Sequence, residues 1–244
     1  MAVVRVYALT LAYNGKNYCG WQVQKNGVSV QKTVQNAIEK VFGESIDLCG
    51  CSRTDSGVHA NGYVCHFKTE KFIDPQRLPL ALNTELPRDI CAKRAELKDE
   101  GFHARYSAKG KEYVYLVWNS RIRNPFMEGL AWQYPFEINA EEANLLAKKF
   151  VGKKDFCSFM SAGSKITDTV REVFDFKVER EGEMVKFTVS ADGFLYNMVR
   201  IMVGTVLKAL NGNLCVDNAI DAKLRSAAGP TAPPEGLYLN RVFY

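Results

Sequence analysis

The stretch SIDLCGCSRTDSGVHANGYVCHF, residues 45–67, sets a polar loop between two apolar segments. Residues 45–49 and 62–67 are rich in the β-branched, aromatic and other apolar side chains that favour strands. Ser, Asp and Gly residues fill the stretch between them, as is usual where a backbone turns. The sequence therefore predicts two strands joined by a loop that carries Arg53, Asp55 and His59.

Arg53 and Asp55 are the residues of this loop that can carry chemistry. Residues two apart in extended backbone point to the same side, so both should share a face while Thr54 points away. A guanidinium beside a carboxylate keeps the carboxylate ionised, and an ionised aspartate is what a nucleophile or a general base requires. The alternative is an Arg–Asp pair that only pins a turn, and the loop taken by itself favours that structural role.

Strands and helices alternate outward from this loop along the whole chain. Their order predicts an α/β or α+β protein of two similar halves, residues 1–119 and 137–244, joined by a connection at 120–136. The helix at 194–210 is apolar almost all round, so it should be buried. The expected strands are 3–11, 45–49, 62–67, 90–97, 112–118, 172–178, 184–190 and 236–243, and the expected helices are 30–42, 74–82, 139–150, 194–210 and 216–224.

The composition is that of an ordinary globular protein. Of the 244 residues, 47% are hydrophobic and 24% are charged, which supplies a core and argues against a disordered or fibrous chain. The longest apolar region, 194–210, is interrupted by Arg200 and Lys208 and is shorter than the roughly 20 residues that a membrane span needs. The N-terminal residues lack a signal-peptide pattern, and the cysteines number seven, an odd count. These features predict a cytoplasmic protein with reduced thiols and no membrane association.

Basic and aromatic side chains are interleaved between residues 101 and 125. Glu112 is the single acid of this segment, which carries most of the chain's net charge of +5. Basic groups contact phosphates and aromatic rings stack on bases, so the pattern is typical of an RNA-binding surface. A solvated strand face whose rings turn toward the core explains it equally well. The basic residues are Arg105, Lys109, Lys111, Arg121 and Arg123.

The segment RTDSGVHA, residues 53–60, resembles the RTDAGVHA signature of the TruA family of tRNA pseudouridine synthases. Other blocks that resemble the family occur in the family's order over residues 7–244, so the resemblance spans almost the whole chain. Any one block is a weak signal, whereas their shared order is a strong one. The blocks are YNGKNYCGWQVQ (13–24), LNTELPRDI (82–90), FHARYSAKGKEYVY (102–115), DFCSF (155–159), FLYNMVRIMVG (194–204) and GPTAPPEGLYL (229–239).

The resemblance implies which residues act in catalysis. Asp55 matches the family's catalytic aspartate, which attacks the uridine, and Arg53 matches the arginine paired with it. Tyr113 matches the tyrosine that packs on the target base and takes part in proton handling. Arg200 matches an active-site arginine on the long apolar helix, where a buried guanidinium needs an anionic partner. Asp55 or a substrate phosphate would serve as that partner.

The resemblance also implies how the substrate is held. Leu237 or Leu239 lies where a leucine of the family closes the uracil pocket. The basic and aromatic stretch is suited to hold the RNA backbone, so Arg121 and Arg123, together with Arg105, are the candidates for phosphate contacts. The enzyme should flip the target nucleotide out of the RNA stack to reach it.

The family's fold, partners and chemistry are expected here on the same ground. The expected fold is pseudouridine-synthase-like, with mainly antiparallel sheets flanked by helices and a basic cleft between the halves. The expected substrate is tRNA, modified at uridines 38, 39 and 40 of the anticodon stem-loop by a homodimer. Isomerisation of uridine involves no redox change and no energy source, so neither a cofactor nor a metal is expected. The preferred uridine, and whether the aspartate attacks the sugar or the base, stay open.

Two other interpretations remain alongside this one. A non-catalytic RNA-binding module could keep the fold, although Asp55, Arg53 and Tyr113 are all present. A zinc site could use cysteines and histidines, although paired Cys-x-x-Cys knuckles are absent from the sequence. The residues of that zinc site would be Cys49, Cys51, Cys65, His59 and His66.

Replacing Arg121 and Arg123 together by glutamine should weaken tRNA binding and flatten its dependence on salt. Each phosphate contact that is lost means fewer counterions released when tRNA binds. The slope of log K against log salt should therefore become less negative by about two. Binding titrations with tRNA between roughly 50 and 200 mM salt measure that slope. An unchanged slope would place the RNA path elsewhere on the protein.

Overall fold

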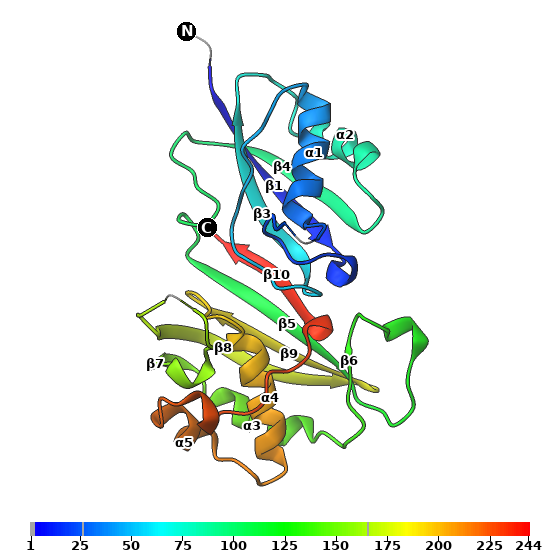
Figure 1. Ribbon diagram of the computed structural model, residues 1–244. Helices are drawn as coiled ribbons and strands as arrows, with labels where there is room; N and C mark the ends of the chain where they lie inside the picture. The colour runs from blue at the N-terminus through cyan, green and yellow to red at the C-terminus, as the bar shows by residue number, and fades with distance from the viewer. Residues whose placement is uncertain (1–2, 26, 165) are drawn as a thin grey trace. The chain divides into compact units, whose positions relative to one another are not determined.

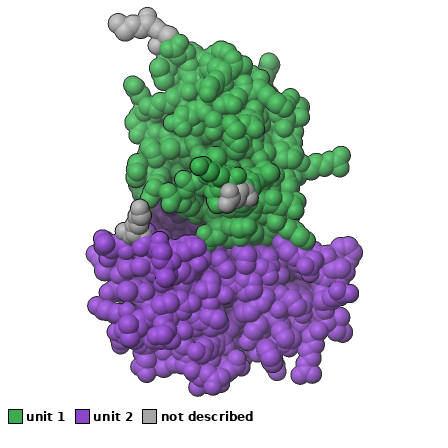
Figure 2. Space-filling view, viewed as in Figure 1, with its two compact units in different colours: residues 1–109, 238–244 green, residues 110–237 purple. Residues whose placement is uncertain are grey.

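The computed structural model describes residues 3–25, 27–164 and 166–244. The chain divides into two compact units, which Figure 2 colours separately. Unit 1 comprises residues 1–109 and 238–244, and unit 2 comprises residues 110–237. The chain therefore completes unit 2 before its final segment returns to unit 1.

Unit 1 is a mainly antiparallel sheet with helices on one side (Figure 1). Its elements are β1 (Arg5–Tyr13), η1 (Gly15–Asn17, a 3₁₀ turn), α1 (Val30–Phe42), β2 (Cys49–Gly50), β3 (His59–Thr69), α2 (Leu78–Glu85), β4 (Ile90–Lys98) and, from Tyr238 onward, β10 (Leu237–Phe243). The strand order is β4–β1–β3–β10, with β2 paired to β3. β1 runs antiparallel to both β3 and β4, whereas β10 is parallel to β3.

In unit 2, β5, β9, β8 and β7 are successive antiparallel neighbours. Its strands are β5 (Gly110–Trp118), β6 (Trp132–Gln133), β7 (Gly152–Asp155), β8 (Val170–Glu181) and β9 (Met184–Ala191). Its helices are α3 (Ala140–Lys148), α4 (Met198–Leu210) and α5 (Val216–Asp221), with 3₁₀ turns η2 (Pro125–Met127), η3 (Cys157–Phe159), η4 (Arg225–Ala227) and η5 (Pro234–Gly236). The short β6 adds a parallel pair to β5, and α3 packs against β8 and α4.

Helix α1 shows why local sequence sets the element boundaries. The Ser29 hydroxyl accepts a hydrogen bond from the Lys32 N–H, which caps the first turn, and Gly43 ends the helix with a φ of 64°. The apolar side chains recur every three or four residues and are buried on one face. They are Val30, Val34, Ala37, Ile38 and Phe42. The predicted helix at 30–42 is confirmed.

The predicted fold class, α+β with mainly antiparallel sheets flanked by helices, is confirmed. The boundaries of the compact units differ from those of the predicted halves, which were 1–119 and 137–244 with a connection at 120–136. The strand at 110–118 belongs to unit 2, because it pairs with β9 along its whole length. Residues 238–244 belong to unit 1, where Tyr238 and Leu239 pair with β3.

The largest errors in the predicted element boundaries are three starts that lie four residues too early. The helix expected from residue 194 begins at Met198, because Asn197 adopts a left-handed backbone with a φ of 61°. The helix expected over 74–82 runs instead from Leu78 to Glu85, after a turn in which the Asp74 carboxylate accepts the Gln76 N–H. The strand expected at 45–49 reduces to Cys49–Gly50.

Helix α4 is buried almost throughout, as its apolar sequence predicts. Within the described residues, neither α4 nor any other helix has the length and apolar character needed to span a bilayer. The segment after η4 lies directly on α4 at Gly204, where an added Cβ would stand 2.0 Å from the Pro230 carbonyl oxygen. Beside it, the Thr205 hydroxyl accepts the Gly229 N–H at 2.8 Å. Helix and segment can pack this closely because neither Gly204 nor Gly229 has a side chain.

Gly204→Ala should therefore lower the free energy of unfolding by about 1–3 kcal/mol or more, since the new methyl group overpacks a fixed backbone contact. Urea or thermal unfolding followed by circular dichroism measures this loss. Gly101→Ala is the matched control, because nothing lies within 4 Å of a Cβ there. That control should stay within about 0.5 kcal/mol of the parent protein. Equal stability of both variants would contradict the packing described for α4.

Candidate active site

The loop between β2 and β3 presents Asp55, and the segment before α1 holds the loop in place. The Trp21 N–H donates to the Thr54 carbonyl at 3.1 Å. The Ser56 hydroxyl donates to the Tyr18 carbonyl at 3.1 Å. The residues on both sides of Asp55 are thus tied to residues 18–21, so a second piece of chain fixes the part of the loop from which the Asp55 side chain projects.

Two glycines of that second piece make the close approach possible. Gly20 has a φ of 104°, and a Cβ there would lie 2.4 Å from the Thr54 carbonyl oxygen. A Cβ on Gly15 would lie 2.0 Å from the Val58 carbonyl oxygen. Any side chain at these positions would push the loop away. Neither glycine is among the predicted site residues, although both stand in the block 13–24 that resembles the family.

The side chains of the loop alternate as the extended backbone predicts. Thr54 is buried, 7% exposed, and its hydroxyl lies 2.9 Å from the Tyr13 hydroxyl. Arg53 is exposed and Asp55 is half-buried, so these two face the solvent side of the loop. Thr54 therefore anchors the loop on its buried side, while Arg53 and Asp55 stay accessible to solvent.

His59 ties the end of the loop to the turn η1 and to β10. It is buried, and its Nδ1 accepts the Gly15 N–H at 3.0 Å. Its ring stacks on Tyr238 of β10, with centroids 4.6 Å apart. Leu239, one of the two leucines expected near the uracil pocket, is fully buried and pairs with Ala60. His59 is a further positioning residue that sequence reasoning assigned only to the zinc alternative.

The remaining candidates of unit 1 are two exposed arginines. Within the residues that the structure describes, no ion pair joins the Arg53 guanidinium to a carboxylate. Arg105 is exposed, and its guanidinium lies over the ring of Tyr106, 5.6 Å from the centroid. Such a cation on an aromatic face is a common element of RNA-binding surfaces.

Tyr113 and Leu237 are buried in unit 2. The ring of Tyr113 on β5 meets Phe194 edge to face, with centroids 5.0 Å apart. Leu237 is 7% exposed and opens β10, which follows directly on the 3₁₀ turn η5. Neither side chain therefore lies on a solvated strand face.

Arg200 lies on the first turns of α4 and is held by hydrogen bonds. Its Nε donates to the Ala232 carbonyl at 2.7 Å, and its Nη1 donates to the Asn197 side-chain oxygen at 2.8 Å. Asn197 is one of two non-glycine residues in the described chain with a positive φ. Non-glycine residues in this backbone region cluster at functional sites, because the cost of strain is tolerated there.

The candidate residues fall into two sets, one in each unit. Asp55, Arg53, Arg105 and Leu239 belong to unit 1. The candidates of unit 2 are Tyr113, Arg121, Arg123, Arg200 and Leu237, and Arg121 and Arg123 are exposed in the segment between β5 and η2. The basic stretch at 101–125 is thus divided between the two units.

The net charge is distributed unequally between the units. Unit 2 contains as many acidic as basic residues, so the whole net charge of +5 resides in unit 1. A positive unit attracts a polyanion at long range, whereas a balanced one does not. The unit that carries Asp55 is therefore also the one with the excess positive charge.

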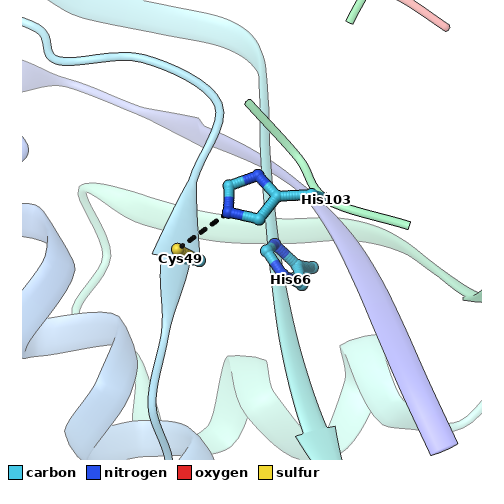
Figure 3. Close-up of side chains that lie close together, drawn as sticks. All are labelled: Cys49, His66 and His103. Carbon is cyan, nitrogen blue, oxygen red and sulfur yellow. Dashed lines mark hydrogen bonds between the residues drawn. The ribbon is translucent and has the colours of Figure 1, made fainter. Parts of the chain in front are cut away.

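Cys49, His66 and His103 form a separate cluster in unit 1 (Figure 3). One ligand-type atom of each lies within 4.8 Å of the others, and Cys49 Sγ is 3.7 Å from His103 Nε2. The cluster takes two residues from the predicted zinc set, Cys49 and His66, and adds His103. Cys51 and Cys65 of that set are buried outside it.

The hydrogen bonds of the cluster favour protonated Nε2 atoms. His66 Nδ1 accepts the Ala104 N–H at 3.2 Å, and His103 Nδ1 accepts the Arg105 N–H at 3.1 Å. A neutral ring that accepts at Nδ1 carries its proton on Nε2, which leaves no lone pair there for a metal. Burial also raises the pKa of the Cys49 thiol, which disfavours the thiolate that zinc requires. The geometry is that of a hydrogen-bonded cluster.

Comparison with known proteins points to a single family. The sequence profile described as tRNA pseudouridine synthase matches residues 10–107 and 146–244. A protein of Thermoanaerobacter sp. (strain X514) named tRNA pseudouridine synthase A is 43% identical over 99% of this chain and 100% of its own length. Its namesake from Acetivibrio thermocellus is 44% identical, and tRNA pseudouridine synthase A 2 of Clostridium perfringens is 41% identical, over the same shares. The matched ranges contain Asp55 and Arg200, while Tyr113 lies between them.

Acidification should destabilise the fold through His66. Burial, reinforced by the neighbouring His103, lowers the pKa of His66 below its ordinary value. Near pH 6.5 the unfolded chain binds a proton at this histidine, whereas the folded protein does not. The free energy of unfolding therefore falls as the pH drops below about 6.5. Urea unfolding between pH 8 and pH 5 should show this fall, and His66→Asn should reduce it while leaving an acceptor for the Ala104 N–H. A His66 ring that titrates at or above pH 6.5 by NMR would contradict the assignment.

Proposed function

This chain belongs to the tRNA pseudouridine synthase family, and we propose that it isomerises uridines 38, 39 and 40 in the anticodon stem-loop of tRNA with Asp55 as the nucleophile. The profile match covers most of the chain, and the relatives are 41–44% identical over its full length. Asp55 stands in the segment that carries the family signature, RTDSGVHA.

The way the loop holds Asp55 is the observation that carries this proposal. Its backbone is fixed from two sides by Tyr18 and Trp21, while its side chain is left half-buried. Catalysis gains most when a reacting group is already in place, because no ordering is needed in the transition state. Glycines at 15 and 20 bring the holding segment close enough to do this.

The conversion of uridine to pseudouridine exchanges one glycosidic bond for another, and this requires an ionised aspartate. The bond between N1 of uracil and C1′ of ribose breaks and a bond between C5 and C1′ forms. C5 loses its hydrogen as a proton and N1 takes up a proton, so the product is an isomer of the substrate. An ionised carboxylate suits attack on either the sugar or the base ring. Electrons are redistributed within the nucleotide, so the chemistry calls for positioned acids and bases rather than for an electron carrier.

The other catalytic roles follow the family pattern residue by residue. We assign Arg53 to the partner of the aspartate and Arg200 to the second active-site cation. Tyr113 is assigned to packing on the target base and to proton handling, and its edge contact with Phe194 supports a fixed ring. Leu237 or Leu239, both buried, is assigned to closing the uracil pocket.

RNA contacts are assigned to exposed arginines. Arg105, Arg121 and Arg123 are all exposed, and the positive charge of unit 1 supports attraction of tRNA. A homodimer in the cytoplasm is proposed on the family pattern. Free cysteines throughout the described chain agree with a reducing compartment.

Asp55→Asn should abolish isomerisation while leaving tRNA binding within about tenfold, because phosphate contacts and catalysis use different residues. The measurement is release of tritium from tRNA labelled at C5 of uridine, since C5 loses its hydrogen only when carbon becomes the glycosidic partner. Asp47→Asn is the matched control, an exposed aspartate of the same unit that should release tritium at the parent rate.

The outcomes separate the alternatives. Release by the parent protein and none by Asp55→Asn supports both the reaction and its nucleophile. Normal release by Asp55→Asn would make the nucleophile assignment wrong. Absence of release by the parent protein, with tRNA still bound, would favour a non-catalytic RNA-binding module.

A further inference from the structure

A groove of about 590 Å³ opens in unit 2, lined by β6, α4 from Gly204 onward and the segment 225–230. Its volume falls within the roughly 300–1,000 Å³ typical of small-ligand sites. The lining combines two aromatic rings, Trp132 and Tyr134, with two cations, Lys208 and Arg225. None of the lining residues is acidic, although unit 2 as a whole has equal numbers of acids and bases.

The groove is built on rigid backbone. Gly204 and Gly229 both line it, and both are packed against backbone atoms of the facing segment. The Thr205 hydroxyl binds the Gly229 N–H at 2.8 Å and donates to the Ile201 carbonyl at 2.7 Å. A ligand would thus enter a preformed site and would not have to order a mobile segment.

Arg225 is held in this groove without a carboxylate partner among the described residues. Its Nη1 donates to the Gly229 carbonyl at 2.8 Å and its Nη2 to the Thr231 hydroxyl at 3.0 Å, which leaves further N–H groups for another acceptor. Burial lowers the pKa of the guanidinium, which is the sign of a cation taken partly out of water. An anion in the groove would offset that cost and accept the remaining donors.

Lys208 adds a second cation beside it. Lys208 is exposed in the last turn of α4, where a positive charge also suits the helix dipole. The dipole accounts for Lys208 but not for Arg225, which lies outside that helix. The two together make a site for a phosphate group.

The aromatic pair supplies a surface of a different kind. The rings of Trp132 and Tyr134 meet edge to face with centroids 5.0 Å apart, and both are half-buried. Tyr115 supports Trp132 from within the unit, also edge to face, at 6.3 Å. Partly exposed, well-supported rings are what nucleic-acid bases stack on.

We propose that this groove binds one nucleotide of a bound RNA, with its base against Trp132 and Tyr134 and its phosphate at Lys208 and Arg225. The proposal goes beyond the isomerisation, because none of these residues is assigned a catalytic role. The groove would be a second contact with the RNA. It would bind a nucleotide other than the target uridine and so help to position the RNA on the protein. A free nucleotide has the same chemistry, so the experiment distinguishes the two sources.

The test uses the full chain labelled with 5-fluorotryptophan, which gives one ¹⁹F signal for each of the three tryptophans. Trp132→Phe assigns the signal of Trp132. Addition of tRNA should shift or broaden that signal, and millimolar uridine or adenosine monophosphate alone should not. A shift produced by the monophosphate and not by tRNA, or no shift with either, would overturn the proposal.

Charge variants test the phosphate contact independently of the aromatic rings. Lys208→Gln should weaken tRNA binding severalfold and reduce the salt slope by about one. Lys186→Gln, which removes an exposed lysine of unit 2 outside the groove, should change neither. Equal binding by both variants, with only the thermal stability of Lys208→Gln reduced, would show that Lys208 serves the helix alone and would overturn the proposal.

Tritium release by the same preparations keeps this inference apart from the proposed function. A parent protein that releases no tritium, yet shows the Trp132 shift and the Lys208 effect with tRNA, would refute the isomerisation and support the groove. A protein that releases tritium normally but shows neither effect would refute the groove and support the isomerisation.

Discussion

The hydrogen bond from the backbone N–H of Trp21 to the backbone carbonyl of Thr54 is the contact on which the candidate active site depends. It joins the loop of Asp55 to a segment more than thirty positions earlier, and it forms only because Gly20 lets the two backbones meet. Thr54 fixes the same loop from beneath through the Tyr13 hydroxyl. The loop is therefore held on both sides of Asp55, and this suits a nucleophile that must act without rearrangement.

The two units differ in charge although both are built on antiparallel sheets. Unit 1 carries the whole net charge of +5, whereas the charges of unit 2 balance. Unit 1 is suited to attracting RNA from a distance, and unit 2 can contribute only short-range contacts such as those of single arginines and aromatic rings. An RNA-modifying enzyme needs both, since attraction alone does not select a nucleotide.

Local signals in the sequence predicted the elements that local contacts form. The helix predicted at 30–42 and the strands predicted at 172–178 and 184–190 were confirmed as α1, β8 and β9. The start of α4 was wrong, because the left-handed backbone of Asn197 interrupts an apolar pattern that continues through it. The motif identified Asp55, but the contributions of Gly20 and His59 arise between segments far apart, where no local pattern reports them. The placement of residues 238–244 in unit 1 has the same origin.

Strand β10 has a consequence for how the protein is made. Its pairing with β3 joins positions such as Asn61 and Asn240, which are 179 residues apart in the chain. A ribosome completes all of unit 2 before it supplies this strand, so the sheet of unit 1 stays open at the β3 side during synthesis. His59 then also lacks the ring of Tyr238 on which it stacks. The loop of Asp55 thus reaches its final support only when synthesis has passed Tyr238, and shorter nascent chains would hold an incomplete site.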